Sequence, residues 1–149
     1  MAYLTIIGKT DTGWATLTPE LNCIGTAKTR EAAVEQAREA IALVLGDAQE
    51  QGATITTLEQ VDPDIRSEMG IEDEVIFLDP APMNPVSLEI AQALERTGIS
   101  QAELARRIGT SRSAVSRMVN PFYWGHSMDL LRRVAEALGL QIEVKLTAA

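Results

Sequence analysis

Polar and basic side chains recur at short intervals between Gln101 and Asn120, in the segment QAELARRIGTSRSAVSRMVN. An arginine can hold a guanine edge through two hydrogen bonds, whereas serine and glutamine are short or neutral donors that suit phosphates. The chemistry that these residue types offer is recognition of nucleic acid by hydrogen bonding. No nucleophile, base and orienting acid are grouped here, so catalysis is not expected.

Three small or apolar residues in this segment predict how it folds. Ala105 is small enough for two helices to cross closely, Gly109 permits the positive φ of a sharp turn, and Val115 can pack beneath that turn. The segment is therefore expected to form two short helices, at residues 101–108 and 112–119, joined by a tight turn.

Alanine at the fifth place, glycine at the ninth and valine at the fifteenth resemble the helix-turn-helix of phage-repressor-type regulators. In that family the second helix lies in the major groove of DNA. The resemblance implies contacts to double-stranded operator DNA from six residues, with Gln101 on a phosphate: Gln101, Ser111, Arg112, Ser113, Ser116 and Arg117. The alternative is a compact helical bundle whose arginines lie on a solvated face.

The surrounding sequence predicts a four-helix domain over residues 86–149. Serines can cap its helices and glycines can end three of them: Ser87, Ser100, Ser111, Ser127, Gly98, Gly109 and Gly139. The alternating tail Gln141–Leu146 predicts a terminal strand that pairs with a second copy of the chain. Residues 122–124 are expected to close the core or a dimer contact, and His126 to serve near a cap or a phosphate.

The first half reads as strands followed by a helix. Strands are expected at 3–7, 14–17 and 23–27, and a long helix from Thr29 to Gly52. Its apolar stripe would be Val34, Ala37, Ile41, Val44 and Ala48. The fold class is therefore α+β: an N-terminal three-stranded antiparallel sheet with one long helix, linked to a helical helix-turn-helix domain with a terminal strand.

An acidic segment with several prolines separates the two halves. Between Glu59 and Asp79 it holds eight acidic residues against one arginine, and within it residues 74–78 alone look like a strand. The predicted organisation is a domain at 1–60, a linker at 61–85 and a domain at 86–149. The linker is either flexible or an arm that binds a partner.

The net charge of −8 is divided unevenly. Residues 1–85 hold five basic and fifteen acidic residues, a net of −10, whereas residues 86–149 hold eight basic and six acidic residues, a net of +2. This asymmetry indicates a basic partner for the first half and DNA for the second.

The composition does not favour metal binding, cofactor binding or membrane insertion. One cysteine, Cys23, and one histidine, His126, offer neither a disulfide nor a metal-ligand set, which predicts no metal and no cofactor. No apolar run is long enough to cross a bilayer, and the first residues do not read as a signal peptide. A cytoplasmic protein is expected.

The N-terminal half resembles the HicB antitoxin family over residues 3–52. The resemblance rests on strand, hairpin, strand and helix, with PELNC leading into Ile24 and TREAA opening the helix. Leu21 and Asn22 stand where the family has Pro-Gly, and asparagine also tolerates left-handed geometry. The resemblance implies a partial ribonuclease-H-like domain, here emptied of its chemistry because the expected strands lack the carboxylates of two-metal hydrolysis.

That family implies an antitoxin and not an enzyme. Its acidic domain would bind and block a small basic ribonuclease of the HicA type, and its second domain would repress the operon as a homodimer or tetramer. Two alternatives remain: a small-molecule sensor that gates a repressor, and an unrelated oligomerisation module. A neighbouring reading frame for a small basic protein would distinguish the antitoxin from both.

Overall fold

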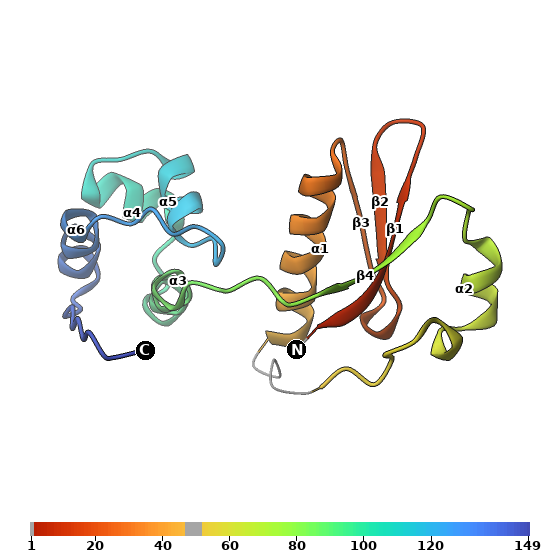
Figure 1. Ribbon diagram of the computed structural model, residues 1–149. Coiled ribbons are helices and arrows are strands. Elements are labelled where there is room, and N and C mark those ends of the chain that lie inside the picture. Colours follow the sequence, from red (N-terminus) through yellow and green to blue (C-terminus); the bar gives the residue numbers. More distant parts are fainter. Residues whose placement is uncertain (1, 47–51) are drawn as a thin grey trace. The chain divides into compact units, whose positions relative to one another are not determined.

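The computed structural model describes residues 2–46 and 52–149. The chain divides into two compact units, Met1–Pro82 and Met83–Ala149, both visible in Figure 1. The boundary therefore falls close to residue 86, where the second domain was expected to begin, but the first unit extends well beyond residue 60.

A four-stranded antiparallel sheet forms the centre of the first unit. Its strands are β1 (Tyr3–Lys9), β2 (Trp14–Thr18), β3 (Cys23–Ala27) and β4 (Glu74–Leu78), in the order β3-β2-β1-β4. The expectation of three strands is wrong by one. The strand-like stretch in the expected linker pairs with β1, placing Ile6 opposite Val75, because an edge strand can be supplied from far along the sequence.

Helix α1 (Arg30–Leu45) packs on one face of this sheet. Thr29 caps it by accepting a hydrogen bond from the Ala32 N–H at 3.2 Å, and Gly46 ends it at a φ of 51°. The helix was expected to reach Gly52, and Ala48 of its predicted stripe lies outside the described residues. Three of the side chains that the helix buries lie one turn apart, the fourth directly follows the last of them, and Val44 is exposed. The buried set is Ala33, Ala37, Ile41 and Ala42.

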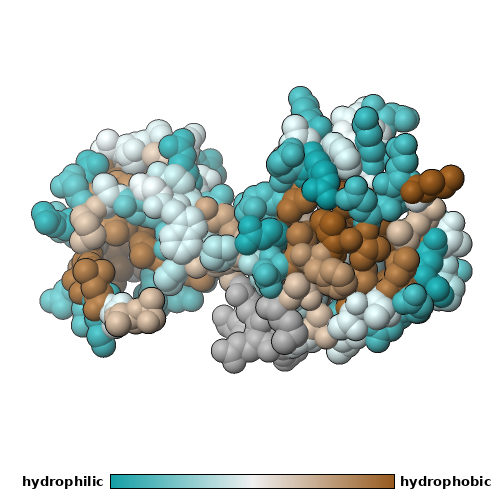
Figure 2. Space-filling view, viewed as in Figure 1, coloured by the Kyte–Doolittle hydropathy of each residue, from teal (hydrophilic) through white to brown (hydrophobic). Residues whose placement is uncertain are grey.

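The opposite face of the sheet is covered by the segment between α1 and β4. This segment contains η3 (Leu58–Gln60) and α2 (Pro63–Glu68). Leu4, Ile6 and Val61 form a buried cluster, and the cluster is flanked by Ile55, Leu58, Ile65, Met69 and Val75. The linker expected at 61–85 is thus largely part of the first unit, because apolar residues at helical spacing are interleaved with its acids. Figure 2 shows hydrophobic residues over the sheet of the first unit and hydrophilic residues around them.

A short turn joins β2 to β3 and fixes the start of the covering segment. η1 (Pro19–Leu21) ends at Asn22 in the left-handed conformation, with a φ of 53°, as expected for asparagine at this position. The Glu20 carboxylate accepts hydrogen bonds from the N–H and hydroxyl of Thr54 and from the Ile55 N–H. Partial burial raises the pKa of Glu20, but these bonds outweigh it and the pKa lies below its ordinary value.

The second unit consists of α3 (Pro85–Thr97), α4 (Gln101–Ile108), α5 (Arg112–Met118) and α6 (Met128–Leu138). Serines cap α4, α5 and α6 as expected, but Asn84 and not Ser87 caps α3. The reason is Pro85, which favours the first position of a helix. Residues 140–149 form no strand, so the expected terminal strand is absent from the single chain, where no neighbouring edge pairs with it.

Candidate nucleic-acid interface

Two helices and a tight turn form the centre of the candidate site. Leu104, Ala105 and Ile108 of α4 are buried against Val115 and Met118 of α5. Gly109 turns the chain between them at a φ of 73°, and the Thr110 N–H donates to the Ala105 carbonyl at 2.9 Å. The sequence-based predictions for Ala105, Gly109 and Val115 are therefore confirmed. Together these three residues fix the angle at which α5 leaves α4.

The N-terminus of α5 presents the predicted contact residues. The Ser111 hydroxyl accepts from the Ala114 N–H at 3.1 Å, so its oxygen caps the helix while its proton can still be donated. Four of the six predicted residues line one open hollow, so α4 and α5 both contribute to a single surface. These four are Gln101, Arg112, Ser113 and Ser116.

Arg112 and Arg117 are exposed on α5, one at each end of the helix. Within residues 2–46 and 52–149, neither guanidinium forms an ion pair or an intramolecular hydrogen bond. A guanidinium without an intramolecular partner can bind a phosphate or a base edge without breaking a hydrogen bond inside the protein. Arg117 lies outside the hollow, so the structure does not bring it together with the other four.

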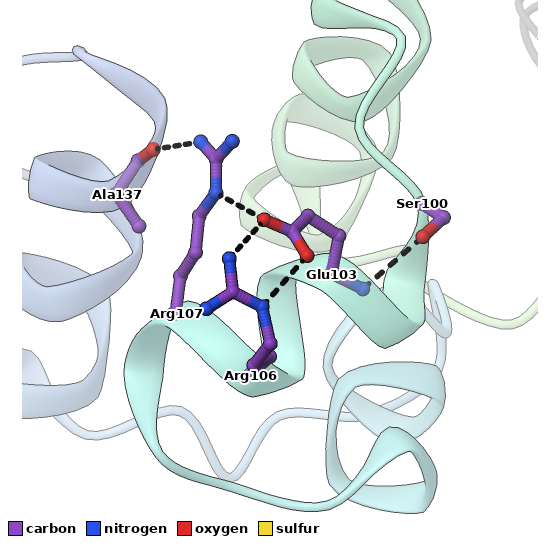
Figure 3. A network of polar contacts seen from close by, with 5 residues as sticks. All are labelled: Ser100, Glu103, Arg106, Arg107 and Ala137. Atoms are coloured by element: carbon purple, nitrogen blue, oxygen red, sulfur yellow. Dashed lines mark hydrogen bonds and ion pairs between the residues drawn. The ribbon is translucent and has the colours of Figure 1, made fainter.

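A polar network on α4 was not anticipated from the sequence. Figure 3 shows Glu103 between two arginines of its own helix. The carboxylate accepts from Arg106 at 2.6 and 2.9 Å and from Arg107 at 2.9 Å. These hydrogen bonds lower the pKa of Glu103 to about 2. The signal that could have found the network is a glutamate followed at the third and fourth places by arginine.

Two arginines then join α4 to α6. The Arg107 guanidinium donates to the Ala137 carbonyl near the end of α6, as Figure 3 shows, and Arg133 of α6 donates to the Ile108 carbonyl at the end of α4. Each helix thus receives a cation at its carboxyl end, where the last carbonyls lack intrahelical partners and the helix dipole is negative. The reciprocal pair stabilises the position of α4 without using the arginines of α5.

The loop between α5 and α6 is attached to the start of α3. His126 lies within hydrogen-bond distance of the Met118 carbonyl at 2.7 Å and of the Asn84 amide at 3.2 Å. Asn84 also donates to the Tyr123 carbonyl at 3.0 Å, and the Tyr123 and His126 rings meet edge to face. His126 therefore joins the loop to α3 and is not a residue of the exposed surface. Of the expected aromatic group, Phe122 and Tyr123 are half-buried, whereas Trp124 is exposed.

Neither a metal-binding cluster nor a membrane-spanning helix is found in the part of the chain that the structure describes. There, no three histidine, cysteine or acidic side chains gather closely enough to hold a metal ion. No helix among the described residues has the length and apolar character to cross a membrane.

Comparison with known proteins identifies the candidate site with a family. The family model of the Cro/C1-type HTH DNA-binding domain matches residues 89–143, which include α4, the turn and α5. No curated protein matches the chain. The second unit therefore carries a helix-turn-helix DNA-binding domain of the Cro/C1 type.

Proposed function

We propose that the chain is the antitoxin of a toxin-antitoxin pair. Its first unit binds and blocks a small basic ribonuclease of the HicA type, and its second unit represses the shared operon by binding DNA. The chain itself catalyses no reaction. The observation that carries this proposal is the division of charge between two compact units, with a net of −10 before residue 83 and +2 after it.

The DNA-binding half is supported by the helix-turn-helix and by the donors exposed on α5. A repressor must contact phosphates for affinity and base edges for specificity, and serines together with unpaired arginines can supply both. One such motif reads few base pairs, so we propose that the protein acts as a dimer on a palindrome. The half-site centres then lie roughly 10 base pairs apart or a multiple of that.

The partner-binding half is supported by the acidic first unit. An acidic surface and a basic ribonuclease attract one another over long distances, which accelerates their association. β1, β2 and β3 carry no aspartate or glutamate and β4 carries only Glu74, so the four strands supply a single carboxylate, where metal-dependent nucleases need several that converge. A unit of this kind is suited to binding and not to hydrolysis.

Two readouts on the full chain test both halves separately. Co-expression with the small basic protein encoded beside this gene should relieve its growth arrest, and purified protein should bind the promoter DNA of the operon. The double variant Arg112→Ala/Arg117→Ala should lose promoter binding and still relieve growth arrest. The proposed antitoxin function is contradicted if the neighbouring gene encodes no toxin. It is also contradicted if the toxin remains active in the presence of the folded protein.

A further inference from the structure

β3 is an outer strand of the sheet, and it lacks the charged residues and prolines that usually protect exposed strand edges from pairing with another chain. β3 pairs with β2 on one side, and no described residue pairs with it on the other. The strand Cys23–Ala27 contains neither proline nor charge, and its β-branched residues Ile24 and Thr26 are exposed. Proteins blunt such edges with charges, prolines or covering elements, and an edge lacking them is a template for a further strand.

An apolar row leads across the sheet to this edge. The registers place Val75, Ile6, Leu17 and Ile24 opposite one another on neighbouring strands, so the four lie on one face. From Ile6 towards the edge the side chains become more exposed: Ile6 is 7% exposed and Ile24 is 74% exposed. The segment around α2 covers the β4 half of this face and leaves the β3 half open.

The open half forms a groove of about 360 Å³. Its lining includes apolar side chains from the sheet and from the α2 segment, two carboxylates and one lysine: Leu17, Ile24, Ile65, Met69, Glu68, Asp73 and Lys9. The groove therefore combines apolar lining residues and two carboxylates, and it lies beside a free strand edge. An extended segment fits these features, because alternate side chains of a strand would enter the groove while its backbone pairs with β3.

We propose that this edge and groove bind an extended segment of a basic protein as a fifth strand, next to β3. The charge of the first unit selects this occupant: fifteen acidic residues against five basic ones would repel a second copy of the same unit and attract a basic chain. The segment carries apolar residues at alternate positions and lysine or arginine near its ends. The inference deepens the proposed function, because it names the surface at which the acidic unit takes its protein partner.

Selection from a random dodecapeptide library on the immobilised full-length protein tests the site without knowledge of the partner. Enriched peptides should alternate apolar residues and carry flanking lysine or arginine, and raised salt should weaken their binding. Ile24→Lys should reduce their affinity at least tenfold, because it removes the apolar contact and places a like charge at the edge. Ile24→Thr keeps a β-branched residue, adds no charge and should reduce affinity less.

Leu43→Lys is the matched control. Leu43 is an exposed apolar residue of α1 that does not line the groove, and its substitution adds the same charge to the same unit. It should leave affinity within twofold. The proposal is overturned if no peptides enrich, if they lack the basic and alternating pattern, or if they bind Ile24→Lys as tightly as Leu43→Lys.

Three further outcomes identify the occupant of β3 and separate this site from the antitoxin function. Should Ile24→Lys change the sedimentation coefficient of the protein alone, β3 pairs with a second copy and the basic occupant is wrong. If the neighbouring toxin binds Ile24→Lys and wild type equally, the antitoxin function is retained, but the β3 edge is not the surface that binds the toxin. If peptides are enriched but no toxin gene lies beside this one, the β3 edge is retained as a binding surface and the antitoxin function is contradicted.

Discussion

Arg112 and Arg117 have no intramolecular partner among the described residues, unlike Arg106, Arg107 and Arg133 of the same unit. Arg112→Ala and Arg117→Ala should each weaken operator binding without unfolding the domain. Loss of a bidentate base contact should cost about 1 to 3 kcal/mol and relax preference at one base pair. Loss of a phosphate contact should lower the salt slope by about one unit instead.

Fluorescence anisotropy at several salt concentrations, with operator and scrambled duplexes, distinguishes these two roles. Arg96→Ala is the control, because Arg96 is an exposed arginine of α3 outside the predicted contact set. Affinity, specificity and salt slope that stay unchanged in both α5 variants would show that the recognition helix is placed wrongly.

Glu103 couples the stability of the second unit to pH. Its pKa of about 2 in the folded protein lies below the ordinary value of 4.5, so the charged form favours folding. This contribution is fully present above pH 4.5 and is lost as the pH falls from 4.5 to about 2. Glu103→Gln should therefore lower the melting temperature of residues 83–149 at pH 7, and the two melting curves should converge near pH 2.

Thermal unfolding followed by circular dichroism between pH 2 and pH 7 measures this effect. Since the network is solvent-exposed, added salt should reduce the difference. Glu95→Gln removes an exposed carboxylate of α3 that has no ion pair within the described residues, and it should leave the pH dependence unchanged. A constant gap between wild type and Glu103→Gln down to pH 2 would contradict the role of this carboxylate.

At the scale of helices and strands, local signals were predictable and long-range pairing was not. The serine caps and the ends of α4 and α6 followed from residue types whose hydrogen bonds are made within one turn. β4 was strand-like in sequence, but its partner β1 lies some seventy residues earlier, and nothing local indicates that pairing. The hollow that joins Gln101 to α5 followed from the motif, whereas Arg133 acts on α4 from a helix outside it.

The position of β4 determines how far the first unit can be shortened. A fragment of residues 1–60 lacks β4, which pairs with β1, and Val61, which is 1% exposed in the cluster over the sheet. It should fail to fold, because the removal exposes Leu4 and Ile6 and frees the ladder groups of β1. A fragment of residues 1–82 should unfold cooperatively in urea, and a cooperative transition in 1–60 would contradict this role of β4.

At the scale of the whole molecule, the C-terminal tail of the second unit exposes a row of apolar side chains. Leu140, Ile142, Val144 and Leu146 are all exposed. The first three line an open hollow with Met128 and Ala135 of α6, and Figure 2 shows hydrophobic side chains where α6 runs into the tail. From residue 141 onward the tail pairs with no strand among the described residues, and an alternating segment of this kind beside an apolar helix face is suited to pairing with its own copy.

The charges of the tail select one register for that pairing. If two tails pair antiparallel about Val144, Ile142 faces the partner's Leu146 and Glu143 faces the partner's Lys145. Apolar residues then share one face, and two opposite-charge pairs form in each dimer. A parallel arrangement in register would instead place Glu143 against the partner's Glu143.

Charge exchange within the tail tests this register on the full chain. Glu143→Lys should weaken the dimer, because both pairs become repulsive, by roughly 1 to 2 kcal/mol or about 5- to 30-fold in dissociation constant. The double variant Glu143→Lys/Lys145→Glu should restore wild-type affinity, since the pairs are re-formed with exchanged signs. Sedimentation equilibrium at micromolar concentration measures both. A double variant no tighter than the single one would exclude the register, and a chain ending at Gly139 that still dimerises would move the interface to the exposed Trp124 and its neighbours.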